Sequence, residues 1–567
     1  MRAAGVDAVR RVAATTAVPA QDRGDRTGPP GAPGARLGGG AAHPPTLTHA
    51  RVVADVGGGR QNGRVLLSDV VATSRAVSAT RSRKAKVTAI AELLSTAAPE
   101  EIETVTSYLG GTLRQRRTGL GWRGLSTLPP PADSPTLTVL GVHATFDAIA
   151  GLAGSGSQAA RAAAVAELFG RATADEQAWL RGAVTGAVRQ GALDALVQEA
   201  VAAAAGVPLA SVRRAAMLAG STTQVVVAAM TGGEDALAGF GLEVGRPVLP
   251  MLASSAPDLA AAVAKAGGGR VAVDVKLDGI RIQVHRDGDE IRIATRTLED
   301  ITARLPEVVA VARELPAARF VLDGEALALD QIGRPRPFQE TASRTAQSGG
   351  VAVTPYFFDL LHVDGADLLD APGVDRVAAL ERLVPSPYRV PRLVTDDLAA
   401  AQAFLDEALR SGHEGVVVKN LAAAYDAGRR GSAWVKVKPV HTLDLVVLAV
   451  EQGSGRRQGW LSNIHLGARD PATGEFVMLG KTFKGMTDEM LAWQTERFTE
   501  LETSRTSYVV HVRPEQVVEV AFDGVQRSTR YPGGMALRFA RVVRYRDDKT
   551  AADADTIDTV RQFLGSA

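Results

Sequence analysis

The chain of 567 residues contains no cysteine. This absence excludes disulfide bridges, zinc sites built on thiolates and cysteine nucleophiles, and it fits a reducing compartment. The sequence also lacks any run of the roughly 18 apolar residues that a membrane-spanning helix needs. Its formal net charge is only +2, so a nucleic-acid surface would have to come from local clusters of Lys and Arg. We expect a soluble cytoplasmic protein without a membrane partner.

The length exceeds what one hydrophobic core supports, and the pattern changes along the chain predict several domains. Residues 1–64 are rich in Gly, Pro, Ala and Arg without a hydrophobic period, as in the run GPPGAPGARLGGG. We interpret them as a disordered tail, or as an extension upstream of a natural start near Val65. Three further segments are predicted: a helical domain (65–240), a mixed domain of strands and shorter helices (247–440), and a small β-barrel (441–567).

The helical segment opens with apolar residues at helical spacing, from Leu67 to Val77, and Ser68 is expected to cap this first helix. Two basic clusters follow, the second between glycine-rich turns. Their members are Arg81, Arg83, Lys84, Arg114, Arg116 and Arg117. The ordinary interpretation of each charge is a solvated helix face. As a set beside glycine, which lets backbone approach a phosphate closely, they favour contact with a duplex backbone.

One stretch, RVAVDVKLDGIRIQVHRDGDEIRIATR over residues 270–296, dominates the chemistry. It predicts three strands joined by tight turns, with Asp274 and Lys276 on one face of the first strand and valines on the other. A lysine at a surface strand end would be unremarkable. At the end of a buried strand, Lys276 is interpreted as a nucleophile, which must be neutral to attack.

Other strands carry charges next to apolar residues. Glu325 ends RFVLDGE, Glu414 begins EGVVVK, and Trp434, Lys436 and Lys438 share a face in WVKVKP. Charges on buried strands are costly unless they are paired or liganded, so these residues predict a polar site. The cations, with Arg281, could neutralise a polyphosphate, and the carboxylates could hold Mg²⁺. Lysine attack on an α-phosphate would then release pyrophosphate.

These segments resemble, in order, the motifs of a known family. KLDGIR at Lys276 resembles the nucleotidyl-lysine motif of ATP-dependent DNA ligases and capping enzymes. The later matches over about 275 residues are TRTLEDIT, LDGE, YFFDLLHVDG, EGVVVK, WVKVKP and RFARVVRYRDDK. The helical segment resembles the DNA-binding domain of the larger ligases. The resemblance implies an all-α DNA-binding domain, an α+β nucleotidyltransferase (adenylation) domain and a β-barrel OB-fold domain.

The resemblance also implies site residues. Lys276 would be adenylated, Asp274 would lie beside the adenine amino group, and Phe358 would stack on the base; many relatives carry glutamate at the position of Asp274. Arg281 and Glu325 would hold ribose. Phosphates would be faced by Arg296, Arg430, Lys436 and Lys438. Glu325 and Glu414 would be the metal ligands. In the OB-fold domain, pyrophosphate would be oriented by Arg541, Arg544 and Lys549.

The implied activity is ATP-dependent sealing of nicks in double-stranded DNA, through a lysyl-AMP and an adenylated 5′-phosphate. The implied cofactors are ATP as substrate and Mg²⁺ or Mn²⁺. We expect a monomer associated with a bacterial nucleoid. The sequence leaves open whether the enzyme serves replication, repair or recombination. A sliding clamp also stays open as a partner, although no motif supports one.

The alternatives are other covalent nucleotidyltransferases, namely an RNA ligase or a capping guanylyltransferase, and a non-catalytic DNA-binding scaffold. Neither nucleotidyltransferase has an evident use for the long helical segment with its basic clusters. An NAD-dependent ligase is disfavoured because its zinc element requires cysteines, which this chain lacks. A scaffold would not need the full set of charged residues.

Overall fold

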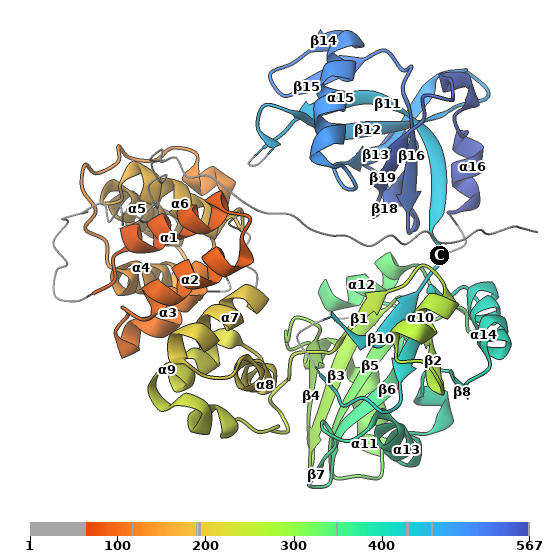
Figure 1. The fold of residues 1–567 in the computed structure, drawn as a ribbon, viewed down its shortest axis with the longest axis horizontal. Helices are drawn as coiled ribbons and strands as arrows, with labels where there is room; N and C mark the ends of the chain where they lie inside the picture. The colour runs from red at the N-terminus through yellow and green to blue at the C-terminus, as the bar shows by residue number, and fades with distance from the viewer. Residues whose placement is uncertain are drawn as a thin grey trace, which may run out of the picture. The chain divides into compact units, whose positions relative to one another are not determined.

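The computed structural model describes residues 64–564, except 116, 189, 191–193, 347–349, 427–429 and 455–456 (Figure 1). The predicted tail therefore lies outside the described residues, apart from residue 64. Among the helices of the described part, none combines the length and the apolar character that crossing a membrane requires.

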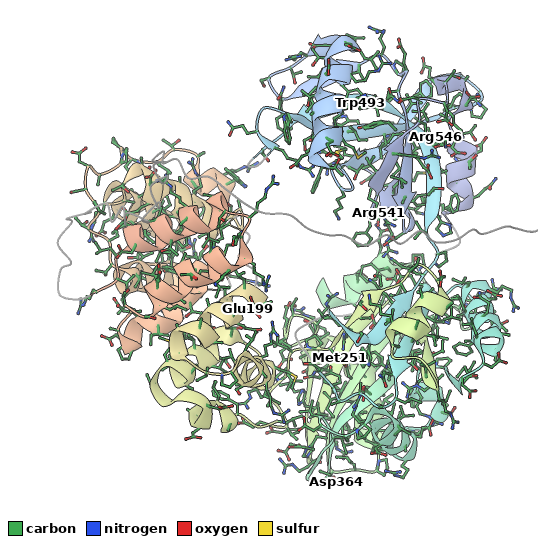
Figure 2. The ribbon with its side chains drawn as sticks, viewed as in Figure 1. Glu199, Met251, Asp364, Trp493, Arg541 and Arg546 are labelled. Atoms are coloured by element: carbon green, nitrogen blue, oxygen red, sulfur yellow. The ribbon has the colours of Figure 1, made fainter. Side chains whose placement is uncertain are left out.

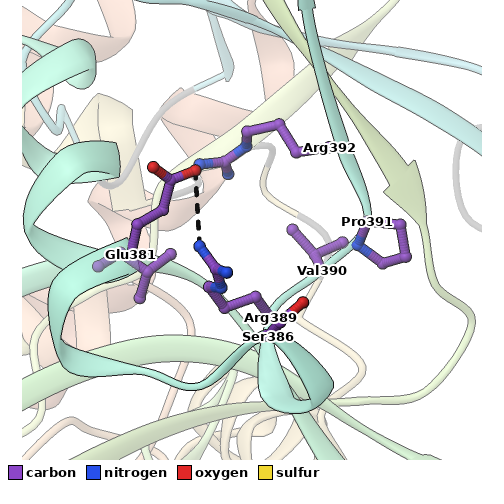
Figure 3. Close-up of a pocket in the computed structure, with 7 residues that line it drawn as sticks. Glu381, Ser386, Arg389, Val390, Pro391 and Arg392 are labelled. Atoms are coloured by element: carbon purple, nitrogen blue, oxygen red, sulfur yellow. Dashed lines mark ion pairs between the residues drawn. The ribbon is translucent and has the colours of Figure 1, made fainter.

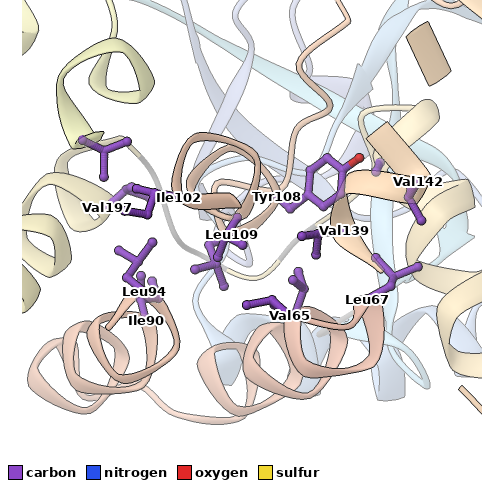
Figure 4. Close-up of a cluster of buried hydrophobic side chains, with 14 of the residues drawn as sticks. Val65, Leu67, Ile90, Leu94, Ile102, Tyr108, Leu109, Val139, Val142 and Val197 are labelled. Atoms are coloured by element: carbon purple, nitrogen blue, oxygen red, sulfur yellow. The ribbon is translucent and has the colours of Figure 1, made fainter. Parts of the chain in front are cut away.

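The N-terminal described region is helical, as the sequence predicts. Its helices are α1 (Leu67–Ala79), α2 (Arg83–Leu94), α3 (Pro99–Leu109), α4 (Val139–Gly151), α5 (Ser157–Gly170), α6 (Ala174–Val184), α7 (Asp194–Ala205), α8 (Leu209–Ala219) and α9 (Thr222–Ala238). They enclose one cluster of buried side chains that includes Leu67, Tyr108 and Val139 (Figure 4). The connection between α3 and α4 is mostly irregular and holds only a short 3₁₀ turn, Trp122–Leu125.

The start of α1 differs from the sequence prediction. The helix begins at Leu67, so Ser68 lies inside its first turn and does not cap it. The carboxylate of Asp69 accepts the backbone N–H of Leu66 instead, at 3.0 Å. The apolar spacing was interpreted correctly, because Leu67 and Val77 are both buried in the helical core.

The mixed region contains two five-stranded sheets (Figure 1). The first has the order β1 (Leu252–Ser255), β10 (Arg430–Val437), β9 (Gly415–Asn420), β2 (Val271–Lys276), β8 (Arg392–Thr395). Its pairs are antiparallel except β1 with β10. The second sheet is antiparallel, with the order β4 (Glu290–Thr295), β3 (Ile280–Asp287), β5 (Arg319–Ala328), β6 (Val353–Val363), β7 (Ala366–Asp367).

Helices pack on each sheet, and the sheets also contact each other. The first sheet shares a core with α10 (Leu259–Lys265) and α14 (Leu398–Arg410). The second shares a core with α11 (Pro306–Glu314) and α13 (Gly373–Leu383), while α12 (Phe338–Ala346) lies near β5. A further cluster joins Trp434 of β10 to Val321 of β5 and Leu361 of β6. Side chains between the sheets therefore come from both.

The C-terminal region is a seven-stranded antiparallel sheet with two helices and a separate hairpin. The sheet contains β11 (His441–Gln452), β12 (Leu461–Arg469), β13 (Phe476–Thr482), β14 (Glu502–Arg505), β15 (Val509–Val512), β16 (Val517–Phe522) and β19 (Arg541–Tyr545). The hairpin is β17 (Gly524–Arg527) with β18 (Met535–Arg538), and the helices are α15 (Asp488–Glu500) and α16 (Ile557–Gln562). The basic segment 537–546 is divided between β18 and β19 at Phe539, whose φ is 53°.

A buried histidine ties the start of the mixed region to β3. Nδ1 of His285 accepts the backbone N–H of Gly245 at 3.0 Å, and Nε2 contacts Oε1 of Gln283 at 2.9 Å. That oxygen also accepts the N–H of Val248 at 2.8 Å. Because Nδ1 accepts the N–H of Gly245, a proton added to Nδ1 would point at that N–H and break the hydrogen bond. Burial, with the nearby Arg292, lowers the pKa of His285 to about 3.

We expect acid to destabilise the protein partly through His285. The unfolded histidine takes up a proton near its ordinary pKa of 6.5, whereas the folded one stays neutral to about 3. Stability from this residue is therefore complete above pH 6.5 and falls as the pH drops through that window, by at most about 1.4 kcal/mol per pH unit. Urea unfolding at several pH values should show a shallower acid loss for His285→Gln. Parallel pH profiles for the two proteins would contradict this.

Candidate active site

The first sheet has two chemically different faces. On one face, the valines of β2, β9 and β10 are buried against α10 and α14. They are Val273, Val275, Val416, Val418, Val435 and Val437. Because side chains alternate between the faces of a strand, the residues between these valines all lie on the other face. That face carries the charges that the sequence analysis selected.

Strand register aligns these charged residues in rows across the sheet. Asp274 of β2 lies opposite Arg392 of β8 and opposite Val417 of β9, which in turn lies opposite Lys436 of β10. In a neighbouring row, Lys276 lies opposite Gly415. Cross-strand neighbours on one face are within side-chain contact distance. Hydrogen-bonded pairing therefore brings residues of four strands together.

Lys276 is held by the segment that precedes β9. Its Nζ donates to Oε2 of Glu414, and its backbone carbonyl accepts the N–H of Glu414 at 3.2 Å. The other carboxylate oxygen of Glu414 lies 3.3 Å from Nζ of Lys438. Burial alone would raise the pKa of Glu414, but the charges of Lys276 and Lys438 outweigh it and lower that pKa. The carboxylate of Glu414 therefore stays ionised between the two lysine side chains.

Two glycines let the strands approach closely at this point. A Cβ on Gly279, in the turn after Lys276, would lie 2.3 Å from the carbonyl oxygen of Ala326 in β5. A Cβ on Gly415 would lie 2.2 Å from the carbonyl oxygen of Val437, and its φ of 141° is also unfavourable for other residues. The glycines of the KLDG and EG segments are therefore required by backbone packing.

The second sheet contributes an arginine and a glutamate. Arg281 of β3 donates to both carboxylate oxygens of Asp323, at 3.0 and 2.6 Å, and to the carbonyl oxygen of Met251 at 2.6 Å. Tyr425 donates to Asp323 at 2.7 Å. Glu325 lies opposite Arg281 in the register and accepts the N–H of Gly279 at 3.2 Å. Burial raises the pKa of Glu325 to about 7, although Lys276 and Arg281 oppose that shift.

Aromatic rings and a buried lysine line the same space. The rings of Phe358 and Trp434 meet edge to face, with centroids 5.9 Å apart. Nζ of Lys419 lies 4.5 Å from the Phe358 centroid and 4.2 Å from that of Trp434. It also forms an ion pair of 2.7 Å with Asp274. A cation over two ring faces gains from their quadrupoles, which partly offsets its burial.

Residues of the C-terminal region reach the Lys276 segment. NH1 of Arg538 lies 2.8 Å from the carboxylate of Asp278, and Lys438 pairs with Asp523. Arg541 of β19, labelled in Figure 2, lies 3.7 Å from Asp523. Arg544 and Lys549 are elsewhere: the first pairs with Glu519 and the second with Asp444.

Many of these residues line one cavity of about 820 Å³. Its lining includes ten of the residues predicted from the sequence: Asp274, Lys276, Arg281, Arg296, Glu325, Phe358, Glu414, Lys436, Lys438 and Arg541. Arg544 and Lys549 do not line it, and the side chain of Arg430 lies outside the described residues. Lining residues that sequence reasoning missed include Lys419, Lys484, Asp523, Arg538 and Phe539. Of these, Lys419 ends the segment EGVVVK, and Arg538 and Phe539 begin RFARVVRYRDDK, but none of the three was selected as a site residue.

The donor set of the cavity fits a hard divalent cation. Glu325 and Glu414 both line it, and carboxylate oxygen is the ligand that Mg²⁺ prefers. Among the described residues, no group of three or more His, Cys, Asp or Glu side chains is arranged to hold a metal. Two carboxylates with room for phosphates and water suit Mg²⁺ better than an all-protein cage would.

The basic clusters of the helical region differ in how far their charges are paired. Arg83 is paired with Glu199 of α7, labelled in Figure 2, and Arg114 with Glu103, both at 2.8 Å. Lys84 and Arg117 are exposed and form no ion pair within the described part of the chain. Arg81 is exposed but pairs with Asp488 at 3.2 Å, and Arg116 lies outside the described residues.

The fold and the site together define a multidomain nucleotidyltransferase, with a helical N-terminal region and an OB-like C-terminal domain. Three family models match the chain: "DNA ligase N terminus" over residues 123–202, "ATP dependent DNA ligase domain" over 250–438 and "ATP dependent DNA ligase C terminal region" over 457–549. The chain belongs to the ATP-dependent DNA ligase family.

Individual relatives agree with this membership. A protein of Nocardioides sp. strain JS614 named "Probable DNA ligase" is 76% identical over 509 residues, which is 89% of this chain and 100% of the relative. Another of that name, from Kineococcus radiotolerans, is 70% identical over 499 residues, covering 88% and 99% of the two chains. The solved structure Pmar-Lig_PreS3, with 16% identity, covers 84% of this chain and 99% of its own at a TM-score of 0.58, which shows the shared fold.

We expect Gly279→Ala to destabilise the mixed region by about 1–3 kcal/mol, because the added methyl would overlap the backbone of Ala326. Urea unfolding of the purified variant measures this. Gly151→Ala is the matched control, since a Cβ there meets no atom within 4 Å and the residue ends α4. The control should be neutral or more stable by up to about 1 kcal/mol. Equal stability of both variants would contradict the close approach.

Proposed function

We propose that this chain seals nicks in duplex DNA at the expense of ATP, with Lys276 as the residue that becomes adenylated. The observation that supports it best is the row of charges on one sheet face. Lys276 contacts Glu414 there and, together with Phe358, lines a cavity rich in cations. A nucleophilic amine, a stacking ring and phosphate-neutralising cations are what nucleotidyl transfer requires.

In the first step, neutral Nζ of Lys276 attacks the α-phosphorus of ATP. A nitrogen–phosphorus bond forms and the bond from the α-phosphorus to the bridging oxygen breaks. Pyrophosphate leaves with that oxygen, and the amine gives one proton to water. Glu414, which accepts a hydrogen bond from Nζ, would orient the amine for in-line attack. Lys436, Lys438 and Arg296 line the cavity and would stabilise the charge on the departing pyrophosphate.

The remaining assignments follow the family resemblance. Asp274 would accept a hydrogen bond from the amino group of adenine, and Phe358 would stack on the base. Arg281 and Glu325 would hold the ribose. Arg430 is proposed as a further phosphate contact. Arg541 lines the cavity and would orient pyrophosphate. Arg544 and Lys549, which pair with Glu519 and Asp444, would have to exchange these partners to join it.

A divalent cation, Mg²⁺ or Mn²⁺, would be held by Glu325 and Glu414, and it would supply charge neutralisation at the phosphates. The ionised form of Glu325 is the better metal ligand. Burial raises the pKa of Glu325, and a bound cation would lower it again and so favour the ionised form. Glu414 is already ionised, since two lysines lower its pKa.

After adenylation, AMP would pass from Lys276 to the 5′-phosphate at a nick, and the 3′-hydroxyl would displace it to join the strand. Both are attacks at phosphorus that the same cations can serve. The helical domain (65–240), the adenylation domain (247–440) and the OB-fold domain (441–567) would share the duplex, chiefly through phosphate contacts. We propose that the enzyme acts as a monomer on the bacterial nucleoid.

The decisive test incubates the purified protein with ATP, GTP or NAD, each labelled so that a transferred nucleotide carries the label. We expect covalent label from ATP alone and none in Lys276→Ala. Lys265→Ala is the matched control, because Lys265 is an exposed lysine of α10 whose Nζ donates to the backbone carbonyl of Ser255. It should label like the wild type. Label from GTP, or label persisting in Lys276→Ala, would overturn the assignment.

A second prediction concerns the basic clusters. Each phosphate contact contributes about 0.9 to the slope of log affinity against log salt for duplex DNA. The double variant Lys84→Ala, Arg117→Ala should bind nicked duplex more weakly and with a slope shallower by about 1.8. Binding measured by fluorescence anisotropy over a salt series gives this value. Arg75→Ala is the control, since Arg75 is already paired with Asp175. Identical slopes for all proteins would place the duplex elsewhere.

A further inference from the structure

Asp274 is almost inaccessible, with 2% of its surface exposed, and it is held by two cations from other strands. Nε and NH2 of Arg392 donate to its two carboxylate oxygens, the second at 2.7 Å. Nζ of Lys419 lies 2.7 Å from Oδ2. A carboxylate offers about four acceptor positions, so these three donors leave one.

The same two cations hold Phe358. NH2 of Arg392 donates to the backbone carbonyl of Phe358 at 2.8 Å, and Nζ of Lys419 donates to that oxygen at 3.3 Å. Arg392 therefore contacts both Asp274, proposed to hydrogen-bond the adenine amino group, and Phe358, proposed to stack on the ring. Its side chain is only 8% exposed, and it does not itself line the 820 Å³ cavity.

The charges fix what Asp274 can recognise. Burial alone would raise the pKa of Asp274, but Arg392 and Lys419 outweigh it and lower that pKa. An ionised carboxylate accepts hydrogen bonds and cannot donate them. It suits the exocyclic amino group of adenine and repels the carbonyl oxygen that guanine carries at the same ring position.

We propose that Arg392 is a positioning residue for base selection: it fixes the Asp274 carboxylate and the Phe358 backbone so that one acceptor remains for a 6-amino purine. The inference rests on the proposed function, because it takes Asp274 and Phe358 as the base contacts. The competing interpretation is that Arg392 and Asp274 form a purely structural buried ion pair.

A second cavity gives access to Arg392 and so offers a sharp test. This cavity of about 290 Å³ is lined by Glu381, Ser386, Arg389, Pro391 and Arg392, and it shares only Val390 with the larger one. Figure 3 shows the Glu381 carboxylate facing both arginines, 3.6 Å from Arg389. Removing the Arg392 side chain would open a path by which a small planar cation could reach Asp274.

The experiment compares covalent nucleotide transfer from ATP with transfer from purine riboside triphosphate, which lacks the 6-amino group. For Arg392→Ala we expect KM for ATP to rise on the order of tenfold or more, with a smaller change in kcat. KM for the analogue should change little, so discrimination between the nucleotides collapses. Added guanidinium should restore the low KM for ATP, and methylammonium, which lacks the planar fork, should not.

Arg376 provides a matched control. It forms the same kind of buried pair in the same region, but its partner Asp359, unlike Asp274, does not line the active-site cavity. Arg376→Ala should leave the ratio of the two KM values unchanged. Should Arg392→Ala fail to fold, Arg392→Lys keeps the charge without the two-pronged contact and should show the same loss of discrimination.

The outcomes separate the two proposals. Equal losses on ATP and on the analogue, without rescue by guanidinium, would reduce Arg392 to a structural role and overturn the inference. Wild-type protein that takes no label from ATP, or label that persists in Lys276→Ala, would instead overturn the proposed function. Restored discrimination with guanidinium supports both.

Discussion

Charges on the inner face of a sheet must be paired, and this constraint governs the site. The valines of β2, β9 and β10 bury the opposite face, so strand alternation forces Asp274, Lys276, Lys419 and Lys436 toward the second sheet. An isolated charge there would cost several kcal/mol. The carboxylates Asp274 and Glu414 each contact two cations. The two carboxylates are therefore compensated within the protein before any substrate binds.

The pairs also differ in what they leave for a substrate. Nε and NH2 of Arg281 donate to Asp323, and NH1 donates to the carbonyl of Met251. Few of its N–H groups are therefore left to contact a ligand. Lys276 contacts a single carboxylate that it shares with Lys438. A metal or a phosphate that competes for Glu414 would thus alter the partners of Lys276. The proposed nucleophile therefore depends on a carboxylate that other cations can also contact.

Sequence reasoning found the strands that carry Lys276, Glu325, Glu414 and Lys436, because a period of two is visible in a single segment. It could not predict the strand register, because register depends on the pairing of strands that lie far apart in the sequence. Arg392 was missed for this reason: nothing in PYRVPRL marks it until β8 pairs with β2 and places it opposite Asp274. The break at Phe539 was missed because an apolar-basic run gives no local sign of a positive φ.

Asp274 shows how a departure from a family pattern can be accommodated. Where many relatives carry glutamate, this chain has an acid shorter by one methylene, so its carboxylate lies closer to the backbone of β2. That places it directly against Arg392, its cross-strand partner, and within reach of Lys419 on β9. A longer acid would carry its charge past that guanidinium and further into the cavity. The aspartate at position 274 and Arg392 therefore have to be considered together, because the guanidinium fixes where the short carboxylate lies.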